Sequence, residues 1–286
     1  MQILVPDYYK DFKCIADKCK HNCCIGWEID IDEDTLSIYD SIGGDFGKRL
    51  KDNISIGDCP HFILTKDERC PFLNERGLCD IITELGDGAL CDICADHPRY
   101  RNYFSDRVEM GLGLCCEEAA RIILSKTDKV KLIDIDSGET VTPFSEREKA
   151  ISVLQERSLP FYDRLKTLKE IRDKDYSSLL YSLERLDAEW EKYIGLLKHG
   201  TYADLSEWDT LFEQLAVYFV LRHTTEDLNK GILFSAFSVN IIRKICSALK
   251  SQNGALSFSD ILDICRMYSA EIEYSDENIG KIIQEI

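Results

Sequence analysis

Residues 70–99 read CPFLNERGLCDIITELGDGALCDICADHPR and carry four cysteines. Seven more cysteines lie between residues 14 and 116, so eleven of the thirteen in the chain fall in its first 116 residues. The earlier group begins with the spacing Cys14-x4-Cys19-x3-Cys23-Cys24. Such a density of thiols indicates either a set of disulfides or a metal site.

The cellular compartment in which the protein is expected decides between disulfides and a metal site. The first residues, MQILVPDYY, show no basic region followed by an apolar stretch, and no segment has the roughly 18 uninterrupted apolar residues of a membrane span. We therefore expect a cytoplasmic protein that does not enter the membrane. In a reducing cytosol, clustered cysteines more often bind metal, whereas secretion would favour disulfides.

Composition narrows the class of protein further. A length of 286 residues predicts about two domains, and 44% hydrophobic with 30% charged residues is typical of a globular protein. The formal net charge of −17 disfavours nucleic acid and anionic membranes, because phosphate binding uses clusters of Lys and Arg.

The predicted fold class is mainly α. An irregular, cysteine-rich domain with short β-hairpins is expected over 1–125, a linker over 126–143, and an all-helical domain over 144–286. Capping residues and apolar periodicity predict helices in this last part over 145–157, 160–171, 179–197, 207–223, 228–250, 258–270 and 276–286. Cys246 and Cys265 have apolar neighbours and are expected to be core residues.

Local patterns in the cysteine-rich part predict strands and hairpins. Residues 27–32, WEIDID, alternate as a half-buried strand does, and a helix is expected from 32–34 to 41–42. Short strands over 70–73 and 78–82, joined by the turn NERG, would bring Cys70 and Cys79 close together across a ladder.

The pair Cys91-x2-Cys94 has the strongest metal-binding spacing in the sequence. His97 follows closely and is more often a residue that supports a site than a ligand, while Arg99 suits an anion or an ordinary ion pair. Cys116 precedes the expected helix EEAARIIL, whose backbone N–H groups would favour a thiolate. A capping role without chemistry is the alternative.

Several motifs in order resemble the flagellin lysine-N-methylase family. They are VPDYYKDFKC at 5–14, Cys19-x3-Cys23-Cys24-x-Gly-Trp, CPFL at 70–73 with Gly77-Leu-Cys79, Cys94-x2-His-Pro-Arg, and CEEAAR at 116–121. This resemblance implies methyl transfer from S-adenosylmethionine to lysine side chains of flagellin. It also implies an iron–sulfur cluster, with [4Fe–4S] as the expected type and zinc as the alternative.

The family's cysteine pattern carries over onto eight positions: Cys14, Cys19, Cys23, Cys24, Cys70, Cys79, Cys94 and Cys116. Cys59, Cys91 and Cys115 are then additions of this chain, and we expect one cluster with the remaining thiols packed around it. Two four-thiol sites are the other arrangement.

The sequence offers no independent sign of a methyl-donor site. It has neither a Gly-x-Gly-x-x-Gly fingerprint in a strand–turn–helix unit nor the Cys-x3-Cys-x2-Cys spacing of radical S-adenosylmethionine enzymes. The sequence therefore identifies neither catalytic residues nor residues that bind the methyl donor. An iron–sulfur electron carrier and a zinc-stapled interaction module without catalysis are the alternative functions.

Overall fold

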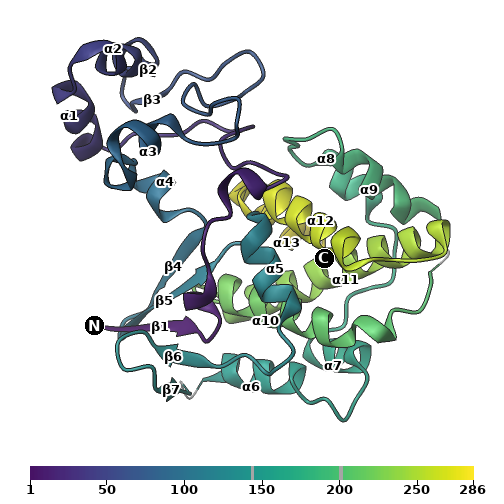
Figure 1. The fold of residues 1–286 in the computed structure, drawn as a ribbon. Coiled ribbons are helices and arrows are strands. Elements are labelled where there is room, and N and C mark those ends of the chain that lie inside the picture. Colours follow the sequence, from purple (N-terminus) through teal and green to yellow (C-terminus); the bar gives the residue numbers. More distant parts are fainter. Residues whose placement is uncertain (143–144, 200–201) are drawn as a thin grey trace. The chain divides into compact units, whose positions relative to one another are not determined.

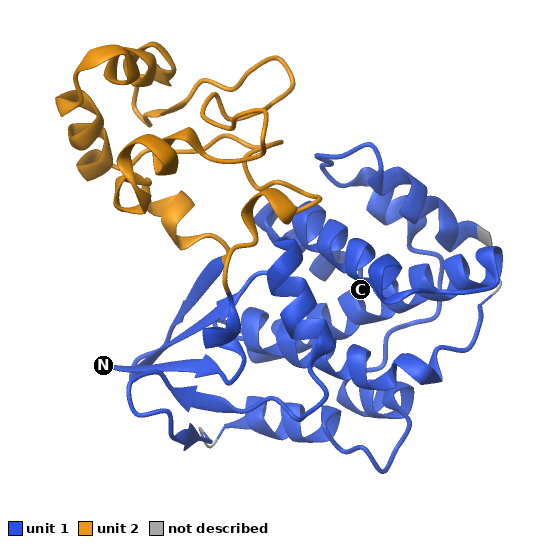
Figure 2. Ribbon diagram, in the orientation of Figure 1, with its two compact units in different colours: residues 1–12, 99–286 blue, residues 13–98 orange. Residues whose placement is uncertain are grey.

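The computed structural model describes residues 1–142, 145–199 and 202–286. It divides into two compact units, one made of residues 13–98 and the other of 1–12 together with 99–286 (Figure 2). The chain thus begins in the larger unit, leaves it to form the smaller one, and returns. The division differs from the expected linker over 126–143, whose last residue lies outside the described part of the chain.

The unit 13–98, which contains most of the cysteines, consists of short elements joined by loops (Figure 1). These are a 3-10 turn Ala16–Lys18, helices α1 Glu33–Ser41 and α2 Gly44–Asp52, the paired strands β2 Ile54–Ser55 and β3 His61–Phe62, helix α3 Asp80–Leu85, a 3-10 turn Asp87–Ala89 and helix α4 Asp92–Asp96. Its core is small and includes the fully buried aromatic side chains of Tyr39, Phe62 and Phe72.

The predictions of two strands in this unit, over 27–32 and 78–82, are wrong. Residues 27–32 form a single isolated bridge, between Asp30 and His61, and no strand. The segment 78–82 pairs with 70–73 only at Leu73 and Cys79 and then enters α3. The physical reason is the Asn74 side chain, whose oxygen accepts the N–H groups of Arg76 and Leu78 and bends the chain too tightly for a ladder.

The carboxylate of Asp32 joins two helix starts in this unit. It accepts the N–H of Thr35 in α1 and the N–H of Asp92 at the beginning of α4, each at 2.8 Å. Burial opposes the charge, but these hydrogen bonds outweigh it and hold the pKa of Asp32 below its usual value.

We expect Asp32→Ala to destabilise this unit by about 1–3 kcal/mol, because a cap and a second hydrogen bond are lost. Asp32→Asn, which keeps one acceptor oxygen, should lie between Ala and wild type. Since the folded-state pKa is depressed, the wild-type contribution is present above about pH 4 and is lost as the pH falls further. Urea denaturation at several pH values measures this, and an Ala variant as stable as wild type would contradict it.

The larger unit contains a five-stranded sheet that the sequence analysis did not expect. Its order is β4-β5-β1-β6-β7, where only the β1–β5 pair is parallel. The strands are β1 Gln2–Pro6, β4 Arg99–Tyr103, β5 Arg107–Leu112, β6 Leu132–Asp134 and β7 Thr140–Val141. The first residues of the chain occupy the middle of this sheet, so the larger unit is not all-helical, although the protein as a whole is mainly helical.

The helices of the larger unit follow the predicted pattern with one correction. They are α5 Glu117–Ser125, α6 Glu146–Leu154, α7 Phe161–Leu168, α8 Ser177–Ser182, α9 Trp190–Leu196, α10 Asp209–His223, α11 Leu228–Asn253, α12 Phe258–Tyr268 and α13 Asp276–Glu285, with a π-helical turn Ser269–Glu273 after α12. The single helix expected over 179–197 is two helices. The chain between them turns because the buried Glu271 carboxylate accepts the N–H groups of Leu186 and Asp187.

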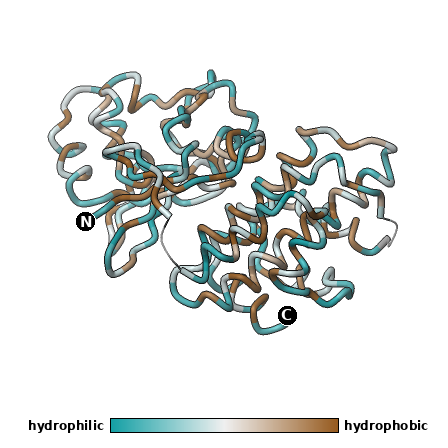
Figure 3. The backbone as a smooth tube through the Cα atoms, turned by 90° about the horizontal axis from the view of Figure 1, so that it is seen from below, coloured by the Kyte–Doolittle hydropathy of each residue, from teal (hydrophilic) through white to brown (hydrophobic). Residues whose placement is uncertain are grey.

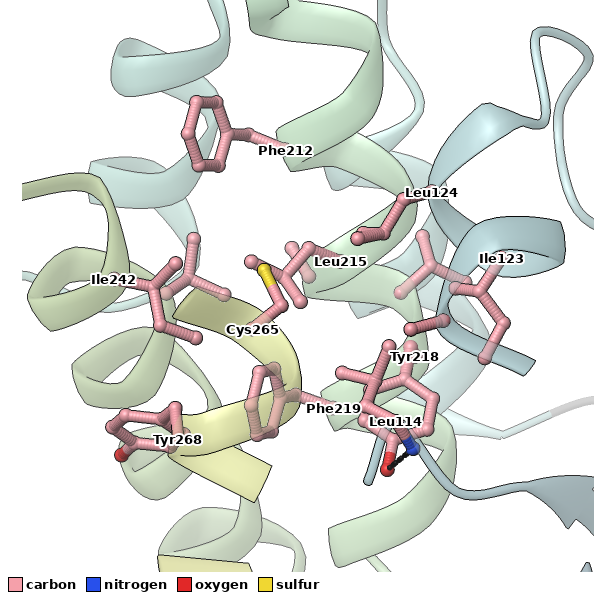
Figure 4. Close-up of a cluster of buried hydrophobic side chains, with 14 of the residues drawn as sticks. Leu114, Ile123, Leu124, Phe212, Leu215, Tyr218, Phe219, Ile242, Cys265 and Tyr268 are labelled. Atoms are coloured by element: carbon pink, nitrogen blue, oxygen red, sulfur yellow. Dashed lines mark hydrogen bonds between the residues drawn. The ribbon is translucent and has the colours of Figure 1, made fainter. Parts of the chain in front are cut away.

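Side chains of α5, α10, α11 and α12 converge in the core of this unit (Figure 4). Cys246 and Cys265 are fully buried there, as expected of packing residues. Hydrophobic and hydrophilic positions alternate along the helices (Figure 3), as they do where one face is buried. Helix α11 is long and apolar enough to cross a membrane, with a mean hydropathy of 1.5, but 67% of that window is buried inside the protein.

Candidate functional site

The eight cysteines that the resemblance assigns to a cluster are divided between the two units. Seven of them lie in the unit 13–98, while Cys116 lies in the larger unit, at the start of α5. Cys116 provides the N-cap position of that helix but makes no side-chain capping hydrogen bond.

Five cysteines gather in the unit 13–98. The N–H of Cys70 donates to the carbonyl oxygen of Cys24 at 2.8 Å, which fixes these two residues side by side. The bridge between Leu73 and Cys79 brings the third, and α4 carries Cys91 at its N-cap and Cys94 in its first turn. All five belong to the same apolar cluster, in which Cys70 and Cys91 are buried.

The thiols of this group influence one another electrostatically. Burial and the neighbouring thiols Cys79 and Cys91 raise the pKa of Cys70 to about 11. Burial also raises the pKa of Cys79. A negative charge on one thiolate therefore raises the pKa of the neighbouring thiols. A bound metal centre, being positively charged, would lower these pKa values.

Two hydrogen-bonded thiol pairs involve members of this group, and one of them adds the exposed Cys23. The Cys24 thiol donates to Cys23 and lowers the pKa of Cys23 to about 7. In the same way the Cys94 thiol donates to Cys91 and lowers the pKa of that thiol. The Cys91-x2-Cys94 spacing thus forms a real pair, and Cys91, which the resemblance leaves out, lies in the group.

The other cysteines of the front segment have different surroundings. Cys14 and Cys59 are exposed, and the Cys19 thiol donates to the carbonyl oxygen of His21 at 3.1 Å. Hydrogen bonding to Asp30 raises the pKa of Cys59. In the larger unit the Cys115 thiol donates to the Tyr274 hydroxyl at 3.1 Å.

His97 and Arg99, the two residues expected to support a site, fall in different units. His97 follows α4 in the unit 13–98, where burial lowers its pKa and its ring lies 6.4 Å from that of Trp27. Arg99 begins β4 in the larger unit, and its guanidinium lies over the rings of Tyr9 and Phe12.

The donor set is of the kind that binds an iron–sulfur cluster or zinc. Across the described residues, no three His, Cys, Asp or Glu side chains lie together as ligands of one metal ion. A cluster does not need this convergence, because it is held by four cysteine thiolates that bind separate irons. Five thiols in one mostly apolar group supply enough ligands of the right kind.

A second group of polar residues, in the larger unit, was missed by the sequence analysis. The carboxylate of Glu273, which is 0% exposed, accepts from the Tyr218 hydroxyl at 3.0 Å and from Nε2 of His223 at 2.6 Å. Burial raises the pKa of Glu273, but the charge of Arg222 and the bond from His223 outweigh it and hold that pKa below its usual value. A lone histidine at the end of an apolar helix gives no signal in a single sequence.

Arg222 completes this network from the same helix end. Its Nη1 donates to the Tyr218 hydroxyl at 2.9 Å, and its guanidinium lies 5.0 Å from the ring centre of Tyr100 and 4.7 Å from that of Tyr274. The network borders a cavity of about 550 Å³, in the size range of small-molecule sites. The side chains around it come from β4, the end of α10, the beginning of α11 and α13.

Comparison with known proteins finds a family match for the carboxy-terminal part of the chain. Residues 165–286 match the family model of the FliB lysine N-methylase C-terminal domain. This segment includes α10, α11, α12 and α13, and therefore both His223 and Glu273. No solved structure matches the chain.

Relatives with assigned names agree with this match. Lysine-N-methylases of Salmonella choleraesuis and Salmonella typhimurium are each 27% identical over 141 residues, which cover 44% of this chain and 33% of theirs. The flagellar biosynthetic protein FliU of Salmonella muenchen is 28% identical over 141 residues, covering 44% of this chain and 79% of FliU. The match to the two methylases spans about a third of their length. These matches show that the carboxy-terminal part of the chain is similar to the lysine N-methylase family.

Proposed function

We propose that the chain carries out S-adenosylmethionine-dependent methylation of lysine side chains on flagellin in the cytoplasm. The observation that carries this proposal is the match of residues 165–286 to the lysine N-methylase domain. The names of the relatives support a methylase of flagellar proteins, since two are lysine-N-methylases and a third is a flagellar biosynthetic protein.

We further propose that the unit 13–98 holds a [4Fe–4S] cluster. The thiols that would hold it are the five that gather there: Cys24, Cys70, Cys79, Cys91 and Cys94. Four of them suffice. Cys91 would be one of the four, because its thiol is buried and pairs with Cys94, and one of the remaining thiols would pack beside the cluster. When bound, such a cluster supplies one-electron redox chemistry at a potential set by burial and by hydrogen bonds to sulfur.

The methylation proposal predicts transfer of methyl groups to flagellin in a reconstituted reaction. Anaerobically purified protein, S-adenosylmethionine and unmodified flagellin are incubated together, and the flagellin is then examined by intact and peptide mass spectrometry. We expect methylated lysines, and calorimetry should show binding of S-adenosylmethionine to the protein alone.

A protein that neither binds the methyl donor nor modifies flagellin would contradict the methylation proposal. If that protein is brown and dithionite bleaches it reversibly, it is an electron carrier. If it is colourless and unfolds when a chelator removes zinc, it is a zinc-stapled module.

A further inference from the structure

Methylation of lysine requires a group that removes a proton. The ammonium of a lysine side chain has a pKa of about 10.4 and holds no lone pair, so it cannot attack a methyl group until it is deprotonated. A positioned base beside the amine performs this step in enzymes and contributes a factor of roughly 10²–10⁴ in rate. The requirement holds whatever the methyl donor is.

The cavity of the larger unit has the lining that a lysine side chain needs. Apolar side chains on its wall, Phe234, Ile279 and Ile283, suit the aliphatic stem. The acidic side chains on the same wall, Glu226, Asp227 and Asp276, can each pair with an ammonium group. The wall also carries Arg101, Arg222 and Lys230, so its charges are balanced. The chain as a whole is acidic, with a net charge of −17, which favours the approach of a basic segment.

His223 stands on the wall of this cavity with one ring nitrogen already engaged. Its Nε2 lies 2.6 Å from Oε1 of Glu273, whose side chain is fully buried. The ring is also held by aromatic contacts, 5.9 Å from Phe219 and 4.8 Å from Phe234 between ring centres. With Nε2–H donating to the carboxylate, the neutral ring keeps its second nitrogen, Nδ1, as a proton acceptor.

The backbone around Glu273 differs from an ordinary helix end. Residues Ser269–Glu273 form a π-helical turn directly after α12. Such turns are rare and frequently occur at functional sites. Helix α11 approaches the end of α10 closely at Gly231, where a Cβ atom would lie 2.1 Å from the carbonyl oxygen of His223. The close approach of α11 therefore restricts the His223 backbone, and Glu273 holds the His223 ring.

We propose that His223 is the general base that deprotonates the acceptor lysine in this cavity, and that Glu273 is the residue that positions it. Nδ1 of His223 takes one proton from the lysine ammonium, and the amine lone pair then forms the N–C bond to the methyl group. The S–C bond of the donor sulfonium breaks, its electron pair stays on sulfur, and the thioether leaves. This inference rests on the proposed lysine methylation but not on the cluster.

The test compares wild type with His223→Gln, because glutamine can still donate a hydrogen bond to Glu273. We expect unchanged thermal unfolding and a kcat for flagellin lowered by roughly 10²–10⁴. His61→Gln, in the other unit, serves as the matched control and should keep the wild-type rate.

A second readout separates failure of this inference from failure of the methylase proposal. The chain has five histidines, so their ring signals are few in an NMR spectrum, and His223→Gln identifies one of them. We expect addition of Nα-acetyl-lysine methylamide to shift the His223 signal saturably in the wild-type protein. An active wild type with a variant rate within about threefold overturns the inference, since a base contributes far more. If the wild-type protein does not methylate flagellin, the methylase proposal fails. If, in addition, the lysine probe does not shift the His223 signal, the base assignment fails too.

Discussion

Replacing Cys91 with serine is expected to leave no more than about a tenth of the wild-type iron on the protein, because a cluster that loses one of four thiolates is no longer held. The same result is expected for Cys24→Ser, Cys70→Ser, Cys79→Ser or Cys94→Ser when the residue is one of the four ligands. Cys91 is the most informative, because its thiol pairs with Cys94 in the structure although the family pattern omits it. Iron and sulfide analysis of anaerobic preparations measures the effect.

Cys14→Ser is the matched control for this experiment. The family pattern assigns Cys14 to the ligands, but its side chain is exposed and accepts a hydrogen bond from the nearby N–H of Ala16. We expect this variant to keep its iron. If Cys14→Ser loses the iron while Cys91→Ser keeps it, the ligand set follows the family pattern and the gathering of the five thiols is not the cluster site.

Glu213→Ala is expected to destabilise the larger unit by about 3–5 kcal/mol, because it leaves a buried charge without its partner. Glu213 is 0% exposed in α10, and its carboxylate accepts from Nη1 of Arg164 at 2.6 Å and from Nη2 of Arg157 at 2.8 Å. The Arg164 side chain is itself 4% exposed and cannot recover water when the carboxylate is removed. Urea denaturation followed by circular dichroism gives the free energy of unfolding.

Two further variants show whether the charge pairing is the cause. Glu146→Ala removes an exposed partner of Lys149 and should cost at most about 1 kcal/mol. The double change Glu213→Leu with Arg164→Met replaces the buried pair by apolar side chains and should recover much of the loss. A Glu213→Ala variant that unfolds like Glu146→Ala would mean that this buried pair does not stabilise the unit.

Periodic and capped helices could be predicted from the sequence, and the sheet could not. Ser145 caps α6 through the N–H of Glu148, and the long apolar stripes of α10 and α11 matched their expected spans within a few residues. The strand β1 is only five residues long and pairs with β5 about 100 residues later. No local pattern reveals such pairing, and the polar strand β4, RYRNY, has no apolar alternation to mark it.

The same distinction applies to the candidate sites. The density of cysteines alone predicted that several thiols gather in the first part of the chain. Which cysteines belong to that gathering depended on how the short elements fold. Cys91 joins the group because α4 begins there, and Cys116 belongs to the other unit because the chain returns to the sheet at Arg99. The pair His223 and Glu273 lies 50 residues apart in sequence, so only the packing of α10 against the π-helical turn brings it together.

The most direct test of the account is the metal content of the wild-type protein purified without oxygen. Iron, sulfide and zinc are determined per chain together with the visible absorption spectrum. We predict about four iron and four sulfide per chain, a brown colour and a spectrum that dithionite bleaches. A colourless protein that carries stoichiometric zinc, or one that holds no metal while its thiols all react freely, would contradict the claim that the unit 13–98 is built around an iron–sulfur cluster.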